Sequence, residues 1–234
     1  MSQAPTSEPI DWQAIELVVF DVDGTLYRQS PLRLRMAREM LMHAAARRSW
    51  RHVSVLGAYR RIREELGEEE TDQFDAVLID RTAQACRVSP DLVRAIAADW
   101  MEQRPLRHLA GRSYDGLVAL FDGLRRHGKV IGIFSDYPAA AKVQALGLSA
   151  DHIVCASDPH VGILKPHPRG LQQIISDAGV APHQTILIGD RVERDGLAAQ
   201  RAGTACLIRS DKPIAGWRTF ARFDDPVFAP VLRP

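Results

Sequence analysis

Two aspartates separated by a single residue follow an apolar segment near the amino terminus of this 234-residue chain. Residues 15–22 (IELVVFDV) predict a buried strand, which carries Asp21 near its end and is followed by Asp23, Gly24 and Thr25. Alternation along a strand sends Asp21 and Asp23 to the same side, and Gly24 lets the backbone leave the strand with unusual dihedral angles. Two carboxylates on one side suit either a metal ion or a division of labour between a nucleophile and an acid.

Further polar residues follow two later apolar segments. Ser135 and Asp136 come after a predicted strand at 129–134, and the Ser135 hydroxyl is suited to holding phosphate oxygens together with nearby backbone N–H groups. Lys165 precedes Pro166, which keeps the lysine out of a helix. A compact ammonium suits a site that must neutralise a carboxylate and a phosphoryl group together. Taken alone, Ser135 and Asp136 are better explained as a helix start, and Lys165 as a surface lysine.

A second acidic group follows the predicted strand at 185–188. Asp190 and Asp195, with Glu193 between them, offer carboxylate oxygens, which are the ligands that Mg²⁺ prefers. Simple ion pairing with Arg191 and Arg194 is the alternative for this segment. The ordered occurrence of all four polar segments after predicted strands favours a site for chemistry over four separate structural explanations.

The elements that must position these residues alternate along the second half of the chain. Apolar segments at 129–134, 153–156, 185–188 and 204–208 predict strands, and the segments at 117–127, 139–146, 169–178 and 196–201 predict helices. This alternation predicts an α/β fold with a Rossmann-like, doubly wound parallel sheet. Ligands of such sheets bind at the carboxyl ends of the strands, where the polar segments lie.

A helical region separates the first strand from the others. Residues 27–111 are rich in Ala, Leu, Arg and Glu, and turn signals at Ser49, 67–71 and Ser89-Pro90-Asp91 divide them into about four helices. We therefore expect a discontinuous core made of residues 1–27 and 112–234, with residues 28–111 inserted as an all-helical domain. The tail at 216–234 contains three prolines and is expected to form a loosely packed arm.

Charge is concentrated in the helical region. Residues 28–63 contain ten arginines and one acid, Glu39, whereas eight acidic residues follow between 64 and 80. Adjacent blocks of opposite sign pair with each other or are solvated, and the alternative is recognition of an anion. Arg28, Arg33 and Arg35 follow the first aspartates most closely, so they are the arginines expected to contact an anionic or polyhydroxylated leaving group.

Composition limits the partners and the location. With 46% hydrophobic and 25% charged residues the chain is an ordinary globular protein. A formal net charge of +1 argues against nucleic acid as a partner, and no apolar segment approaches the roughly 20 residues that span a membrane. The first residues do not form a secretory signal, so a cytoplasmic monomer or homodimer is expected. Cys86, Cys155 and Cys206 lack the spacing of a disulfide framework or zinc site and are expected to be buried thiols.

The order D-x-D-G-T, Ser, Lys-Pro, G-D-x-x-x-x-D resembles the haloacid dehalogenase-like hydrolase superfamily, and the helical insertion resembles its C1 cap. The resemblance covers residues 15–26 and 113–210 of the core and, with the cap, most of the chain. It implies a mobile helical lid over the core. It also implies that Asp21 is the nucleophile, Asp23 the general acid and base, Ser135 a phosphate ligand and Lys165 the charge stabiliser.

The same resemblance implies a Mg²⁺ ion and a phosphate cradle. Asp21, Asp190 and the main-chain carbonyl of Asp23 would hold the metal, with Asp195 in its coordination shell or just outside it. The last motif is one residue longer than its commonest form, which leaves both places open for Asp195. The remaining phosphate-binding positions that the resemblance implies are those of Gly24, Thr25 and Asp136.

The activity implied is that of a Mg²⁺-dependent phosphomonoester hydrolase, which acts on a small phosphorylated metabolite through an aspartyl phosphate. Related dehalogenases lack an acid two positions after the nucleophile, whereas Asp23 is present here. Related phosphonoacetaldehyde hydrolases need a cap lysine, and residues 27–111 contain none. A phosphomutase uses the same core residues and stays open as an alternative. A catalytically inactive binding module is the alternative of another class, and the complete motif set argues against it.

Overall fold

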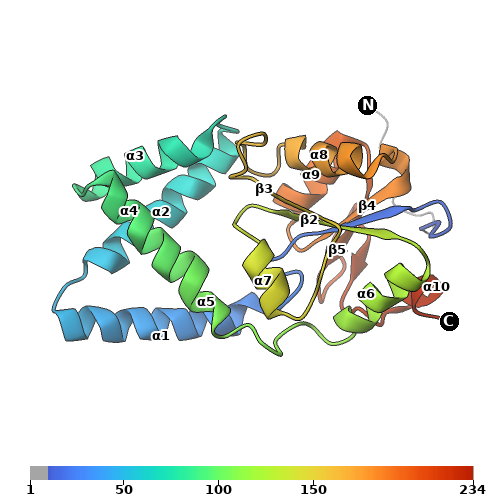
Figure 1. Ribbon diagram of the computed structural model, residues 1–234, viewed down its shortest axis with the longest axis horizontal. Coiled ribbons are helices and arrows are strands. Elements are labelled where there is room, and N and C mark those ends of the chain that lie inside the picture. The colour runs from blue at the N-terminus through green and yellow to red at the C-terminus, as the bar shows by residue number, and fades with distance from the viewer. Residues whose placement is uncertain (1–9, 234) are drawn as a thin grey trace.

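A six-stranded parallel sheet forms the centre of the computed structural model, which describes residues 10–233 (Figure 1). The strands lie in the order β3-β2-β1-β4-β5-β6, and every neighbouring pair is parallel. Their bounds are β1 (Leu17–Phe20), β2 (Val130–Ser135), β3 (His152–Cys155), β4 (Thr185–Gly189), β5 (Ala205–Arg209) and β6 (Thr219–Phe220). The predicted doubly wound α/β fold is confirmed, with strand ends shifted by one or two residues.

The central strand β1 is buried on both faces, because helices cover the sheet above and below. Leu17 and Val19 belong to one apolar cluster, which includes residues of α8 and α9, and Val18 and Phe20 belong to the other, which includes residues of α6 and α10 (Figure 1). These core helices are α6 (Leu117–Arg126), α7 (Ala140–Ala145), α8 (Arg169–Ala178), α9 (Leu197–Ala202) and α10 (Ala229–Leu232). An unbroken apolar sequence is therefore the expected pattern for β1.

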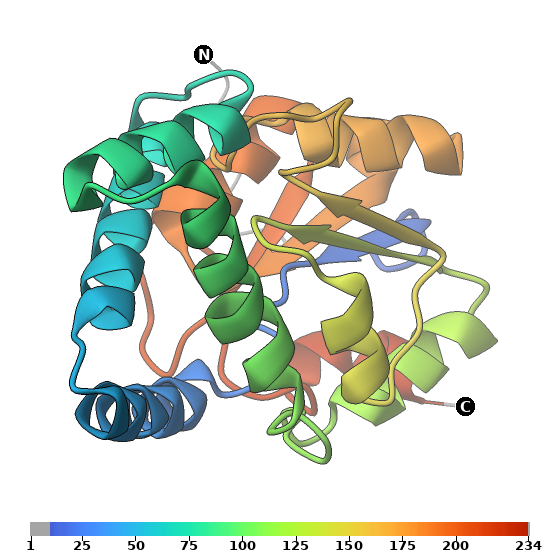
Figure 2. The ribbon, with the colours of Figure 1, turned by 60° about the vertical axis from the view of Figure 1, so that its left-hand side comes forward.

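Between β1 and β2 the chain forms a group of helices beside the sheet, which Figure 2 shows from a second side. These are α1 (Gln29–Arg47), α2 (Arg51–Glu68), α3 (Phe74–Cys86), α4 (Pro90–Ala97), a π-helical turn η1 (Ala98–Gln103) and α5 (Arg104–Leu106). The predicted start at Ser89 is confirmed, because its hydroxyl accepts a hydrogen bond from the Leu92 N–H at 3.3 Å and Pro90 is the first helical residue.

The predicted break at 67–71 is present but begins later than Gly67, because α2 continues through this residue to Glu68 and α3 starts at Phe74. A side-chain carbon on Gly67 would lie 2.0 Å from the Arg194 guanidinium. The absence of a side chain at Gly67 therefore lets α2 lie close to Arg194 of the core.

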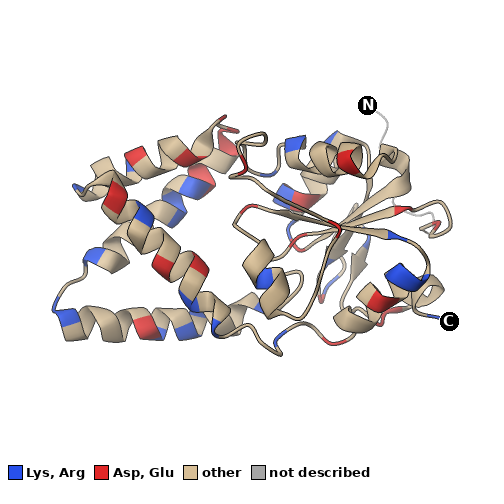
Figure 3. Ribbon diagram, viewed as in Figure 1, with Lys and Arg blue, Asp and Glu red and all other residues tan. Residues whose placement is uncertain are grey.

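The acidic block at 64–80 pairs with the core as well as within the helical insertion. Figure 3 shows acidic positions gathered where α2 and α3 lie nearest the core. The pair of Arg61 and Glu65 agrees with the expectation, whereas three other acids contact arginines of the core. Their closest oxygen to nitrogen distances are 2.6 Å for Glu64 with Arg194, Glu70 with Arg201, and Asp72 with Arg169. The expectation that the two charged blocks pair with each other or are solvated is therefore wrong for these three acids.

The prediction of a loose arm at 216–234 is also wrong over its described part. Phe220, Phe223, Phe228 and Val231 are buried, and the Trp12 indole N–H donates to the Val227 carbonyl at 2.7 Å. The aromatic side chains close the face of the sheet that α6 covers, and they override the local signal of the prolines. Residues 1–9 and Pro234 belong to the predicted core but lie outside the described residues. The same holds for the prediction that the amino-terminal residues do not form a secretory signal, because it falls largely on residues 1–9.

Phe223→Ala is expected to lower the free energy of unfolding by about 3–5 kcal/mol, because it leaves a cavity among packed rings. Denaturant unfolding followed by circular dichroism measures this change. The neighbouring Arg222→Ala provides the matched control, since the side chain of Arg222 is 62% exposed and pairs with Asp224 at the surface. Equal stability of the two variants would show that the tail is not part of the core.

The three cysteines differ in how deeply they are buried. Cys155 is buried, whereas Cys86 and Cys206 are only partly buried, so the expectation of three buried thiols is wrong for two of them.

Across residues 10–233, no helix combines the length and the apolar character needed to cross a membrane.

Candidate active site

The four polar segments meet at the carboxyl end of the sheet, where they form one side of a cavity of about 370 Å³. β1 leads into Asp21, β2 ends at Ser135, β4 leads into Asp190, and Lys165 lies in the connection after β3. The predicted residues that line the cavity are Asp21, Asp23, Ser135, Asp136, Lys165, Asp190 and Asp195. Parallel strands that end at one edge of a sheet bring together residues up to 174 positions apart in sequence.

Gly24 links the first and the last of these segments. Its φ of +108° is accessible to glycine, and a side-chain carbon there would lie 2.1 Å from Asp190 Oδ2. Gly24 and Thr25 are not among the residues that line the cavity, although both belong to the turn after β1. The Thr25 hydroxyl is buried and has no hydrogen-bond partner among the described residues.

A buried lysine connects the two acidic segments. Lys165 Nζ donates to Asp21 Oδ1 at 2.6 Å, to Asp195 Oδ1 at 2.7 Å and to the Phe134 carbonyl at 3.3 Å. Burial alone would lower the pKa of Lys165, but the charges of Asp195 and Asp21 outweigh it and raise the pKa well above its usual value. The lysine is therefore a fixed positive charge beside Asp21.

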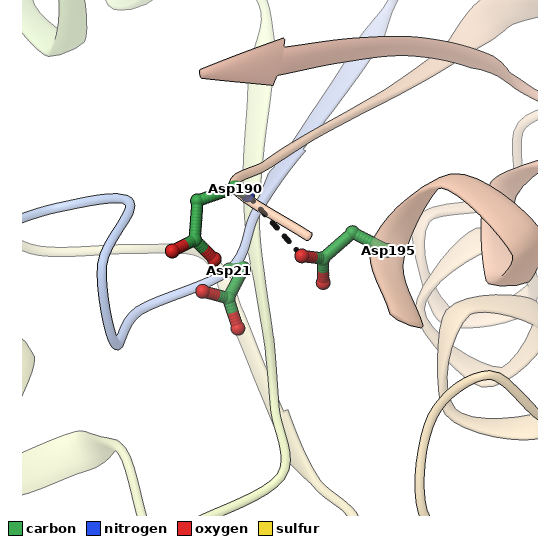
Figure 4. Close-up of side chains that lie close together, drawn as sticks. All are labelled: Asp21, Asp190 and Asp195. Carbon is green, nitrogen blue, oxygen red and sulfur yellow. Dashed lines mark hydrogen bonds between the residues drawn. The ribbon is translucent and has the colours of Figure 1, made fainter. Parts of the chain in front are cut away.

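Three carboxylates crowd together next to this lysine. Figure 4 shows Asp21, Asp190 and Asp195 converging, and ligand oxygens of the three lie within 4.8 Å of one another. Burial raises the pKa of Asp21, and the charges of Asp195 and Asp190 add to this effect. Burial and Asp195 raise the pKa of Asp190 to about 6. A buried cluster of hard oxygen donors with excess negative charge fits a divalent cation such as Mg²⁺.

Asp195 has a second set of contacts that distinguishes it within the cluster. Its Oδ2 accepts the backbone N–H groups of Asp190 at 3.2 Å and Arg191 at 3.1 Å, while its Oδ1 accepts Lys165. It therefore orients both the Asp190 loop and the lysine. Glu193 points elsewhere, because it pairs with Arg191 at 2.8 Å and is 63% exposed.

The Asp23 carboxylate lies outside the three-carboxylate cluster and has its own partners. It accepts hydrogen bonds from the Tyr27 hydroxyl and from Lys142 Nζ, which lies 2.6 Å from one oxygen and 2.8 Å from the other. Burial would raise the pKa of Asp23, but the Lys142 ammonium, together with the Tyr27 hydroxyl and the charge of Lys165, outweighs burial and lowers it. Sequence reasoning missed both partners. The sequence has only four lysines, at 129, 142, 165 and 212, and this scarcity is a signal that could have drawn attention to Lys142.

The segment after β2 is held by hydrogen bonds of its own. The Ser135 hydroxyl accepts the Tyr137 N–H at 3.2 Å, and Asp136 Oδ1 accepts the Lys165 N–H at 3.0 Å. The Asp136 carbonyl accepts the guanidinium of Arg63, a buried residue of α2 stacked on Tyr137. The Asp136 carboxylate thus fixes the backbone of the loop that contains Lys165.

The helical insertion supplies the other side of the cavity, with an apolar wall and several arginines. Its lining residues are Gln29, Leu32, Arg33, Met36, Arg60, Arg63, Glu64, Trp100, Met101 and Pro105. Among residues 10–233, the side chains of Arg33 and Arg60 have neither a hydrogen-bond nor an ion-pair partner. Arg28 and Arg35 do not line the cavity. Arg28 lies over the Tyr114 ring at 5.5 Å, and Arg35 pairs with Glu39 at 3.6 Å.

Two curated proteins are similar to this chain over most of their length. The glyceraldehyde 3-phosphate phosphatase of Methanopyrus kandleri is 26% identical over 195 residues, which are 81% of each chain. The phosphoglycolate phosphatase of Xylella fastidiosa is 26% identical over 213 residues, which are 87% of this chain and 84% of the relative.

Solved structures share the fold. The crystal structure of a 2-haloacid dehalogenase from Pseudomonas syringae has a TM-score of 0.65 at 20% identity, with 93% of this chain and 98% of that chain covered. The family model for haloacid dehalogenase-like hydrolases matches residues 15–203, which include the sheet through β4, the inserted helices and all four polar segments. The family expected from the motifs is confirmed, and the chain belongs to the haloacid dehalogenase-like hydrolases.

Proposed function

We propose that this hydrolase is a Mg²⁺-dependent phosphomonoesterase, which acts on a small phosphorylated substrate through an aspartyl phosphate on Asp21. The observation that carries the proposal is the position of Asp23, which lines the same cavity as Asp21 and Lys165. A carboxyl group at that position can give a proton to a leaving oxygen, and dehalogenation does not require such a step. The names of both curated relatives, which are phosphatases, support the same reaction.

The first half-reaction follows from the charges around Asp21. A carboxylate oxygen of Asp21 forms a bond to phosphorus while the bond from phosphorus to the leaving oxygen breaks. The Lys165 ammonium, 2.6 Å from Asp21, offsets the repulsion between the carboxylate and the phosphoryl oxygens. At this step Asp23 must hold a proton, although its contacts with Lys142 and Tyr27 favour the ionised form. It gives that proton to the leaving oxygen, and the Ser135 hydroxyl holds a phosphoryl oxygen.

The second half-reaction reverses the role of Asp23. As a carboxylate it takes a proton from water, whose oxygen bonds to phosphorus as the bond to Asp21 breaks. Inorganic phosphate then leaves and free Asp21 is restored. The same group serves both steps, because each departing or entering oxygen lies on the side of phosphorus away from Asp21.

The acidic cluster would hold the Mg²⁺ ion. Asp21, Asp190 and the main-chain carbonyl of Asp23 would supply its ligands, with Asp195 in or beside the coordination shell and fixing the loop of Asp190. When bound, such an ion neutralises phosphoryl charge and orients the transferred group. We assign residues 28–111 as the cap that excludes bulk water from the cavity.

Phosphate release from p-nitrophenyl phosphate with Mg²⁺ tests this function, followed by a screen that includes phosphoglycolate and glyceraldehyde 3-phosphate. We expect inorganic phosphate to be released at a rate set by enzyme concentration. Transfer of phosphate to a second substrate hydroxyl instead would indicate a phosphomutase. Release of halide from a 2-haloacid, without phosphate release from any ester, would contradict the proposal.

Arg33 is the one of the three proposed specificity arginines that lines the cavity, and Arg60 lines it from α2. Arg33→Ala is expected to lower kcat/KM for the best anionic substrate by about 10- to 100-fold, since it removes a charge-assisted hydrogen bond. The loss for p-nitrophenyl phosphate, whose leaving group has no second anion, should be smaller. Arg35→Ala is the matched control, and equal losses in the two variants or for the two substrates would remove Arg33 from substrate recognition.

A further inference from the structure

Lys142 is a buried cation in the cavity wall that neither the motifs nor the proposed mechanism uses. It belongs to α7, which contacts α5 of the cap on one side and extends from the loop after β2 (Figure 1). Its side chain is 6% exposed, and its ammonium contacts both oxygens of Asp23, 119 positions earlier in the sequence. The ring of Tyr137 lies 5.3 Å from Nζ and covers another side of the ammonium.

These contacts fix the orientation of the Asp23 carboxylate. The Tyr27 hydroxyl donates to Oδ1, and Lys142 donates to Oδ1 and Oδ2, so donors from the segment after β1 and from α7 determine the plane of the carboxylate. Asp23 itself stands in the turn before Gly24, whose positive φ allows the backbone to leave the strand. The turn places the side chain in the cavity, while the direction of its oxygens depends on these donors.

Position matters for a group that serves a reacting oxygen, because a displacement of about 1 Å can cost roughly 10²-fold in rate. A buried ion pair is also weak evidence for a purely stabilising role, since desolvation offsets much of the attraction between its members. The cavity already holds one lysine for phosphoryl charge, Lys165, which contacts Asp21 and not Asp23. Lys165 therefore pairs with Asp21, and Lys142 pairs with Asp23.

We propose that Lys142 is a positioning residue that holds the carboxyl group of Asp23 against the leaving-group oxygen. This inference rests on the proposed phosphatase function and extends it to a residue outside the four motifs. It gives a specific expectation about leaving groups. An alkoxide must receive a proton as it departs, whereas p-nitrophenolate is stable as an anion, so the alkyl ester depends more on the placement of Asp23.

The experiment compares kcat/KM for an alkyl phosphate that the wild-type protein hydrolyses and for p-nitrophenyl phosphate. For each ester, kcat/KM reports the steps up to departure of the leaving group, and it is independent of the later hydrolysis of the aspartyl phosphate that both esters form. Lys142→Met is expected to lower kcat/KM for the alkyl ester by about 100-fold, with a loss about tenfold smaller for the aryl ester. Lys142→Arg, which keeps the charge, should recover part of the alkyl activity, and Lys212→Met is the exposed control.

A double-mutant cycle separates positioning from other roles. In an Asp23→Asn background, Lys142→Met should cause little further loss, because the group that it positions is already gone. Thermal unfolding of each variant identifies any loss that is due to a damaged fold. Equal losses on both esters, or multiplicative losses in the double variant, would overturn the role of Lys142. A wild-type protein that hydrolyses neither ester would instead contradict the phosphatase function itself.

Discussion

Asp21→Asn is expected to abolish turnover, with kcat lower by about 10⁴-fold or more, while the fold stays intact. The amide has the shape of the carboxylate but cannot form an acyl phosphate with the phosphoryl group. It also removes one negative charge from a crowded, buried cluster, so no loss of stability is expected from repulsion within it. Steady-state kinetics with p-nitrophenyl phosphate and circular dichroism should therefore separate activity from folding.

Asp122→Asn is the matched control for this substitution, because Asp122 is exposed on α6 and does not line the cavity. It should keep wild-type activity. Mass spectrometry of the Asp21→Asn protein checks that the new amide has not deamidated back to aspartate. If a preparation that passes this check keeps more than a small percentage of the wild-type rate, the nucleophile is another group.

Removal of divalent metal is expected to have an effect of similar size. Excess EDTA should abolish phosphate release and added Mg²⁺ should restore it, because the carboxylates of Asp21, Asp190 and Asp195 otherwise repel the phosphoryl group. Ca²⁺ should inhibit, since the larger ion accepts more ligands and disturbs the alignment of Asp21 with phosphorus. Rates measured across a Mg²⁺ titration give the apparent affinity.

Two substitutions assign the metal effect to particular residues. Asp190→Ala should raise the Mg²⁺ concentration needed for half-maximal activity, whereas Glu193→Ala should leave it unchanged. Glu193 is a suitable control because it lies in the same loop but pairs with Arg191 at 2.8 Å. Full activity in EDTA, after a check for carried-over metal, would refute the assignment of the acidic cluster.

The sheet and the catalytic edge could be predicted because their signals are local. An unbroken apolar strand followed by Asp21 and Asp23 is visible in a few residues, and the same holds for Asp190 after β4. Lys165 was recognisable from its proline and from its place in the motif order. Each of these residues lies next to the strand that positions it or in the connection that follows, so spacing along the chain carries the information.

The residues that sequence reasoning missed are positioned by long-range packing. Lys142 lies on a short helix with no motif, and only the fold brings it to Asp23. Arg60 reaches the cavity because the ion pairs and close packing of α2 hold that helix against the core. Phe223 and its aromatic neighbours in the tail were hidden by prolines that locally signal irregular structure. Such contacts depend on tertiary geometry that periodicity does not encode.

Identification of the phosphorylated residue tests the central claim most directly. Asp23→Asn should form the intermediate with p-nitrophenyl phosphate, whose leaving group needs no proton, but should hydrolyse it slowly because the base for water is missing. We predict a burst of p-nitrophenolate close to one equivalent per site, and, after acid quenching and proteolysis at low pH, phosphate on the peptide that contains Asp21. The Asp21→Asn protein should show neither. Turnover without phosphate on that peptide, or phosphate on another residue, would contradict the account.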